Sequence, residues 1–244
     1  VTNHRECRFK MIDTTFNVFS DTPKGKDPDS FSPTLRKYHQ ILWSKPLPCG
    51  IPFTLDLDTP RLLHHKSGLG EFFLSSDQIG NTYSNVKKMS HIVEHIPVDE
   101  MDYFESLRAT IAGHAFFPAK RIDNKMTING ARGVSHQIKD RFDLTLECIR
   151  RFYLDEESPL SDVLERNSPF LRLFESFKGY VDFFLYQDLV ESDYLSIKFW
   201  FPFVNFDNPA LPQTVEEYLY YKARVIVFLN ARNERIKNYG ETTS

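Results

Sequence analysis

Apolar residues recur at steps of three and four along several segments of the chain, which predicts amphipathic helices. Leu35, Tyr38 and Leu42 mark the buried face of one such helix. Ser32 and Pro33 stand just before this face, and a serine followed by a proline is typical of a helix start. Further helices are predicted at residues 86–96 and 99–107, after Ser158-Pro159 and Ser168-Pro169, and after Thr214.

Other segments are rich in β-prone or alternating apolar residues, which predicts strands. They cover residues 8–20, 53–58, 71–77, 109–117, 125–129 and 194–201. Because strands and helices follow one another without a regular βα alternation, we expect an α+β fold. We expect residues 1–244 to form a single globular domain in which several helices pack on a mixed sheet, with residues 1–30 partly irregular.

The strongest helical pattern follows a glycine-flanked turn in which Arg132 lies between Gly130 and Gly133. One apolar stripe predicts a single long helix after the turn, and its members are Val134, Ile138, Phe142, Thr145, Ile149 and Phe152. The first N–H groups of a helix and the helix dipole favour anions, and an arginine adds a planar donor fork. The turn is therefore a candidate anion-binding site.

The predicted ligand of this site carries a phosphate or a carboxylate. Its binding residues are Arg121, Asn129, Gly130 and Arg132, with Asn129 as the helix cap. The segment matches neither the P-loop nor the dinucleotide fingerprint. The competing interpretation is a well-capped core helix, in which Arg132 binds a neighbouring carboxylate such as Asp140 or Asp143.

A second candidate site is the pentapeptide HIVEH, which contains His91, Glu94 and His95. Two histidines four residues apart share one face of a helix and can bind one zinc ion, with the glutamate as general base. In these five residues the chain resembles the inverted-zincin metallopeptidases. The competing interpretation is the exposed end of a helix, where histidines interact favourably with the dipole.

A third candidate site combines a histidine with hydroxyl and carboxylate groups. His65 precedes the strand that contains Ser75, Ser76 and Asp77, and these are the residue types of a hydrolase or transferase site. No nucleophile-elbow sequence surrounds either serine. Arg108 and His114 have a spacing that occurs in some ribonucleases on a helix, but their segment is predicted as a strand. A solvated loop histidine is the competing interpretation for His65.

Composition excludes several classes of protein. The net charge of −3 and the pI near 6.3 give no strong nucleic-acid signature. The chain's three cysteines are Cys7, Cys49 and Cys148, and no pair has the spacing of a zinc cluster. No apolar run approaches the length of a membrane helix, and the first residues show no signal peptide, so we expect a cytoplasmic protein. Aromatic residues reach 14%, which fits an aromatic core or a stacking surface.

Three segments carry a resemblance to a known family: DPDSFSPTLRKYHQILWSKPLP, GEFFLSSD and DRFDLTLECIRRFY. Together they resemble an uncharacterised bacterial family whose domain has no known function. The resemblance runs through most of the chain and implies a bacterial, soluble, stand-alone protein. It implies no activity and no catalytic residues.

The first functional hypothesis is an enzyme that acts on a nucleotide or another phosphate-bearing substrate, such as a toxin- or defence-like transferase or nuclease. The second is a non-enzymatic interaction protein whose aromatic residues and proline-rich loops bind a partner. The third is a zinc hydrolase built on HIVEH. Cofactor, substrate and oligomeric state cannot be predicted from these patterns.

Overall fold

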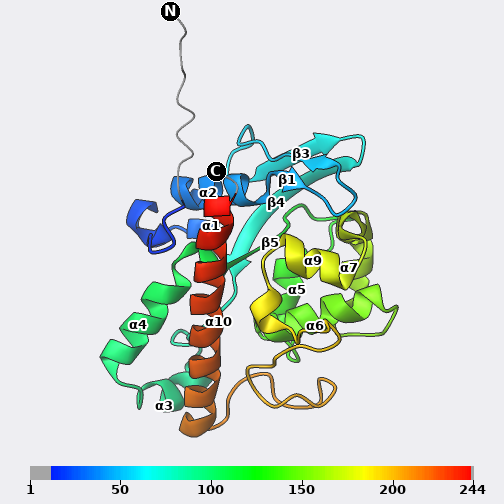
Figure 1. The fold of residues 1–244 in the computed structure, drawn as a ribbon. Helices are drawn as coiled ribbons and strands as arrows, with labels where there is room; N and C mark the ends of the chain where they lie inside the picture. Colours follow the sequence, from blue (N-terminus) through cyan, green and yellow to red (C-terminus); the bar gives the residue numbers. More distant parts are fainter. Residues whose placement is uncertain (1–11, 243–244) are drawn as a thin grey trace, which may run out of the picture.

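The computed structural model describes residues 12–242 and has the predicted α+β class (Figure 1). Cys7 and residues 8–11 of the first predicted strand lie outside the described residues. Residues 12–20 of that prediction do not form a strand. They form turns that lead into a short 3-10 helix, η1 (Val18–Asp21), because Asn17 caps this helix by accepting a hydrogen bond from the Phe19 amide at 2.9 Å.

The larger sheet has three strands in the order β3 (Leu63–Ser67), β4 (Gly70–Gln78) and β5 (His114–Pro118). Both neighbouring pairs are antiparallel, and Leu74 of β4 stands opposite Leu63 and Pro118. A second sheet pairs β1 (Lys45–Pro46) with β2 (Pro52–Phe53), also antiparallel. The described chain therefore carries two antiparallel sheets where we expected one mixed sheet.

Helices supply most of the remaining regular structure. The α-helices are α1 (Pro28–Phe31), α2 (Pro33–Trp43), α3 (Ser90–Val93), α4 (Val98–Arg108), α5 (Ile128–Val134), α6 (Phe142–Tyr153), α7 (Ser161–Arg166), α8 (Ser168–Leu171), α9 (Phe177–Phe183) and α10 (Val215–Thr242). Further 3-10 helices are η2 (Lys87–Met89), η3 (Ile111–Gly113), η4 (Arg172–Phe174) and η5 (Gln187–Leu189). Two predicted starts are confirmed, because the Ser32 hydroxyl caps α2 and the Thr214 hydroxyl caps α10.

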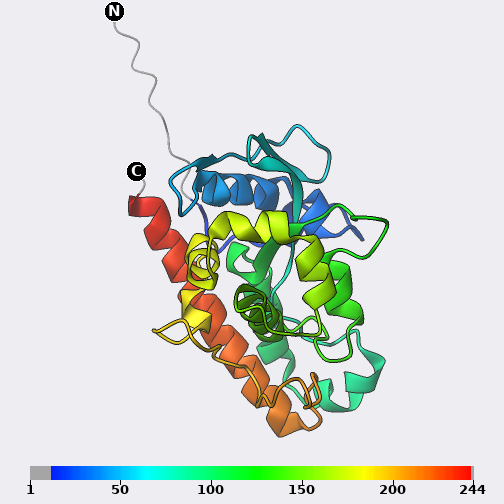
Figure 2. The same ribbon diagram turned by 90° about the vertical axis from the view of Figure 1, so that its right-hand side faces the viewer.

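Helices cover both faces of the strand pair β4–β5. Successive side chains of a strand point to opposite faces. Phe116 of β5 stacks on His39 of α2 with ring centroids 5.0 Å apart, while Phe117 faces Phe142 of α6 at 6.4 Å. Figure 1 shows α10 running the length of the molecule beside α4, with α5 to α9 gathered on the other side of β5. In the turned view of Figure 2, α10 forms one edge of the molecule.

Arg232 ties α10 to the sheet from the inside of the protein. Its side chain is fully buried. The guanidinium donates to the carbonyl oxygens of Ala112 and His114 at 2.7 and 2.9 Å. It also donates to the carbonyl of Phe184, just after α9, at 3.1 Å. Since a buried charge without partners is costly, these bonds fix α10 against β5 and α9 together.

The prediction of a single long helix after the glycine-flanked turn is wrong. The chain forms two helices, α5 and α6, and Gly130 lies inside α5 rather than in a turn before it. Lys139 and Asp140 between them have φ values of 46° and 60°, which a right-handed helix does not allow. The predicted strand at 125–129 is absent too, because Thr127 caps α5 by accepting from the Gly130 amide.

The strand predicted at residues 194–201 is also absent. Asp143, in the first turn of α6, is fully buried and accepts a hydrogen bond from the Trp200 amide at 3.0 Å. The same carboxylate pairs with the Arg141 guanidinium, which also donates to the Ala210 carbonyl at 3.3 Å. These side-chain contacts, rather than a ladder of backbone bonds, position the segment that joins η5 to α10.

We predict that Asp143→Ala lowers the free energy of unfolding by about 3–5 kcal/mol, because it leaves the buried Arg141 guanidinium without its counter-charge. Urea denaturation followed by circular dichroism measures this loss. Glu157→Ala removes an exposed carboxylate just after α6 and serves as the matched control, with an expected change within about 0.5 kcal/mol. Equal losses in the two variants would contradict the role given to Asp143.

Candidate functional site

The end of β4 carries the densest group of candidate residues. Ser76 lies on the face of the sheet that α1 covers, and Ser75 and Asp77 lie on the opposite face. Asp77 pairs with Arg132 of α5, so the structure brings together a predicted catalytic residue and a predicted anion-binding residue. These two residues are 55 positions apart in the sequence.

The donors of Arg132 are directed at protein atoms. Its side chain is fully buried, and its Nη1 contacts the Asp77 carboxylate. Its Nε donates to the Thr145 hydroxyl at 2.9 Å, and its Nη2 donates to the Asp140 carbonyl at 3.0 Å. This arrangement agrees with the competing interpretation, in which Arg132 of a core helix binds a carboxylate, and that carboxylate is Asp77.

The pKa of Asp77 is raised to about 6. Burial is the largest cause, because it disfavours the ionised form. The Arg132 guanidinium acts in the opposite direction, while Asp140 and Asp27 add repulsion. Asp77 can therefore change its protonation state near neutral pH, which is a property of general acids and bases.

A second polar group lies on the other face of β4. The Ser76 hydroxyl donates to the Asp29 carboxylate of α1, and the Nε2 atom of His114 lies 3.8 Å from the same Asp29 oxygen. The Nδ1–H of His114 donates to the Thr110 carbonyl at 2.9 Å, because that carbonyl can only accept. Burial raises the pKa of Asp29 and lowers that of His114 to about 4.

No pattern in the sequence pointed to Asp29, and His114 was noticeable only for its spacing from Arg108. Asp29 lies 47 residues before Ser76, in a segment rich in proline and aspartate that looked like a loop. Its partner residues become visible only when α1 packs on β4. The pattern DPDSFSP, a cap followed by a proline, was the one local signal of an ordered element there.

His65 does not join Ser75, Ser76 and Asp77. It stands opposite Phe72, and Ser76 is four residues further along β4, or about 13 Å at the usual rise of a strand. The imidazole contacts the Thr54 carbonyl at 2.7 Å and the Ser67 hydroxyl at 2.8 Å, and stacks on Phe53. The predicted grouping of a histidine with these serines is corrected accordingly.

The HIVEH segment does not have the geometry of a zincin helix. The helix α3 ends at Val93, so His91 and His95 do not share a helix face. His91, Glu94 and His95 are all exposed. Within residues 12–242, no three His, Cys, Asp or Glu side chains are arranged to hold a metal ion. Pro97 shortens this helical segment, as a proline does after a helix end.

The remaining predicted anion-binding residues belong to two segments, Arg121 to the chain after β5 and Asn129 and Gly130 to α5. Arg121 is exposed on the segment that follows β5. Asn129 is in the first turn of α5, and its Nδ2 donates to the Ser76 carbonyl at 3.4 Å rather than capping a helix. The Gly130 amide donates to the Thr127 hydroxyl at 3.2 Å. The first turn of α5 is therefore capped by the Thr127 side chain, and its Gly130 amide is not directed at a ligand.

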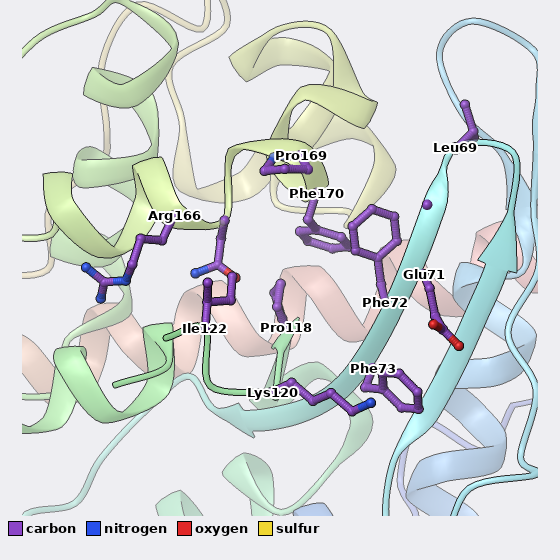
Figure 3. Close-up of a pocket in the computed structure, with 12 residues that line it drawn as sticks. Leu69, Glu71, Phe72, Phe73, Pro118, Lys120, Ile122, Arg166, Pro169 and Phe170 are labelled. Carbon is purple, nitrogen blue, oxygen red and sulfur yellow. The ribbon is translucent and has the colours of Figure 1, made fainter. Parts of the chain in front are cut away.

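A pocket opens where β5 ends (Figure 3). The last backbone hydrogen bond between β4 and the chain after β5 runs from the Ala119 amide to the Phe73 carbonyl at 2.8 Å. After it the chain turns away from β4. The pocket has a volume of about 320 Å³. It is lined by Leu69, Gly70, Glu71, Phe72, Phe73, Pro118, Lys120, Ile122, Arg166, Asn167, Pro169 and Phe170.

Aromatic rings form the wall of this pocket. Phe72 meets Phe170 of α8 edge to face, with centroids 5.6 Å apart. Phe73 stacks on His64 at 4.4 Å, and Figure 3 shows the Lys120 side chain reaching toward the Phe73 ring. The Lys120 ammonium lies 3.0 Å from the centroid of that ring. The wall is therefore apolar with a cation at its edge.

The lining of the pocket carries two cations, Lys120 and Arg166, and one carboxylate, Glu71. Within the described residues, no carboxylate lies within 4.0 Å of the Lys120 ammonium or the Arg166 guanidinium. Within the described residues, the Arg166 guanidinium donates a hydrogen bond to the Met126 carbonyl at 3.4 Å. The one acidic lining residue, Glu71, contacts His64 at 2.9 Å and Lys66 at 3.7 Å. The hydrogen bond with His64 is the largest cause that lowers the pKa of Glu71, and the Lys120 ammonium helps to lower it, but neither cation has a carboxylate of the described residues within 4.0 Å.

Comparison with known proteins gives a family and no activity. The model of DUF6994, a family of unknown function, matches residues 12–236. No curated protein and no solved structure matched the chain. The expected resemblance to a family of unknown function is confirmed, whereas its bacterial source stays a prediction. No helix in the described part of the chain is both long and apolar enough to cross a membrane.

We predict that Asp77 makes stability depend on pH. Folding raises its pKa from 3.8 to about 6, so between these values the folded chain binds more protons and its stability falls as pH rises. Asp77→Asn cannot ionise. From about pH 4 to about pH 7, its free energy of unfolding should therefore rise by up to about 3 kcal/mol relative to the unmodified chain.

Urea denaturation at several pH values measures this difference. The variant Asp162→Asn, which removes an exposed carboxylate of α7, is the control for the loss of one charge. A difference between Asp77→Asn and the unmodified chain that stays constant with pH would show that Asp77 keeps an ordinary pKa on folding.

Proposed function

The chain belongs to DUF6994, a family of unknown function, and from the geometry of its pocket we propose that the protein binds a small ligand that combines a flat ring with an anionic group. A nucleotide is the ligand type that fits this description best. The observation that carries the proposal is an aromatic-walled pocket with two cations that pair with no carboxylate of the described chain.

The ring of the ligand would contact Phe72, Phe73 and Phe170. Aromatic faces bind other rings by stacking, and the contact tolerates any base because every base has a π-face. The volume of about 320 Å³ lies at the lower end of the range for small-molecule pockets. The pocket therefore suits a ligand with one ring system rather than an extended chain.

The anionic group of the ligand would contact Lys120 and Arg166. Charge-assisted hydrogen bonds to phosphate or carboxylate are stronger than neutral ones, and a guanidinium can bind such groups with two donors. Arg121 lies between the lining residues Lys120 and Ile122, so it adds positive charge beside the pocket. We therefore propose that the anion binds at Lys120 and Arg166, and not at the enclosed Arg132.

The proposal is for binding, and chemistry at Ser75, Ser76 and Asp77 is not required by it. None of these residues lines the pocket. A transferase or nuclease activity stays a prediction of the sequence, as do a cytoplasmic location and the alternative of an interaction protein. For the zinc hydrolase alternative, the end of α3 at Val93 removes the helix on which it was based.

We predict that adenosine monophosphate binds about tenfold more tightly than adenosine, because one charge-assisted hydrogen bond contributes roughly 1.5 kcal/mol or more. Isothermal titration calorimetry on the full chain measures both affinities. Lys120→Ala should remove most of this difference while adenosine binding stays the same. Lys125→Ala, which removes an exposed lysine of the same segment, should leave both affinities unchanged.

Three results would count against the proposal. If neither compound binds, the nucleotide type of ligand is wrong. If both bind equally, the cations do not contact the phosphate. If Lys125→Ala weakens the monophosphate as much as Lys120→Ala does, the effect is a general attraction by surface charge, which rising salt concentration would abolish in both variants alike.

A further inference from the structure

Lys45 of β1 is a lysine held among aromatic rings. Its ammonium nitrogen lies 5.1 Å from the ring centroid of Trp43, which ends α2. The same nitrogen is 4.7 Å from the ring of Phe183 in α9 and 4.5 Å from that of Tyr239 in α10. Within the described residues, no carboxylate oxygen comes within 4.0 Å of it. Rings from three helices therefore lie around an amine that pairs with no carboxylate of the described residues.

The amine borders a cavity of about 450 Å³, which is distinct from the pocket of Figure 3. The apolar part of its wall includes Leu47, Pro48 and Phe183. A second lysine, Lys178 of α9, lines the same cavity. A compound that enters the cavity would therefore meet two amines in different surroundings.

Charged groups on two elements act on Lys45. Burial is the largest cause that lowers the pKa of Lys45, and the buried Arg232 of α10 lowers it further, to about 7. Asp182 of α9 opposes this shift, but its carboxylate is already bonded to Lys178, Gln187 and Tyr194. The three rings favour the charged form, because a ring face attracts a cation. A pKa near 7 leaves a large fraction of the neutral amine at neutral pH.

Lys178 provides the contrast within the same cavity. It is exposed and contacts the Asp182 carboxylate. The hydrogen bond to Asp182 is the largest cause that raises the pKa of Lys178. An ordinary lysine is below about 0.1% neutral at pH 7, so Lys178 is a poor nucleophile there.

We propose that Lys45 is a nucleophilic lysine and that its cavity takes a small apolar compound carrying an aldehyde or a ketone. Lysines that act as Schiff-base nucleophiles are activated by desolvation in an apolar pocket or by a neighbouring cation. Lys45 is half-buried beside apolar walls, and the positive charge of Arg232 acts on it. The walls at Leu47, Pro48 and Phe183 fit the apolar body of such a compound. This site is independent of the ligand pocket beside β4.

The reaction is a condensation that needs no further reactant. The lone pair of the neutral Lys45 amine attacks the carbonyl carbon, and a proton passes from nitrogen to oxygen to give a carbinolamine. The carbon–oxygen bond then breaks, the second nitrogen-bound hydrogen is lost, and one water leaves. The product is an imine between Lys45 and the carbonyl compound, and water hydrolyses it back to the starting amine.

The test uses the full chain, benzaldehyde as the probe, and cyanoborohydride, whose hydride reduces the imine to a stable secondary amine. Peptide mass spectrometry then compares the modification rates of Lys45 and Lys178 in the same molecule. Near pH 7 we expect Lys45 to react at least about tenfold faster. Its rate should level off above about pH 8, while the rate at Lys178 should keep rising.

The comparison inside one chain does not depend on the folding of a variant. Lys178→Arg should keep the rapid reaction, and Lys45→Arg should remove it. Equal rates at the two lysines, or a slower rate at Lys45, would overturn the proposal and mean that the rings hold Lys45 as an inert ammonium. Absence of reaction at Lys45 under conditions that modify Lys178 would overturn it as well.

Discussion

Buried guanidinium groups hold distant segments of this fold together. Arg132, Arg141 and Arg232 have side chains that are at most 2% exposed. An arginine does not lose its charge on burial, so each must find acceptors inside the protein. The acceptors come from distant segments, including β4, the loop before α10 and the start of β5. Elements far apart in the sequence are therefore held together at a few polar points within an aromatic core.

Local patterns predicted the elements that depend on local interactions. The caps at Ser32 and Thr214 each use a hydroxyl and an amide within three residues, and β4 follows the alternation of its own side chains. The strand expected at 125–129 is absent because Thr127 caps the helix α5. The strand expected at 194–201 is absent where the Asp143 side chain takes the Trp200 amide, a donor that a strand would have used. Propensity cannot reveal such contacts, since Asp143 and Trp200 are 57 residues apart.

The same limit applies to the candidate site. Both Asp77 and Arg132 were predicted from the sequence, but as members of separate sites, because only the fold brings α5 beside β4. His65 was grouped with the serines by proximity in the chain, and the hairpin register separates them along the strand. The contacts of Asp29 and the pocket lined by Phe72 and Lys120 were not predicted, because each forms only where three segments meet.

The many aromatic rings of the chain have two different effects on lysines. Most rings are in the core, where Phe174, Phe184 and Tyr186 pack against one another. At the surface, the Phe73 ring lies beneath an exposed Lys120, and solvent leaves that cation accessible to an incoming anion. Lys45 is half-buried near three rings, and burial together with the positive charge of Arg232 lowers the pKa of its amine. In the two proposals, the same residue pair, an aromatic ring and a lysine, serves anion binding where the lysine is exposed and nucleophilic chemistry where the lysine is half-buried.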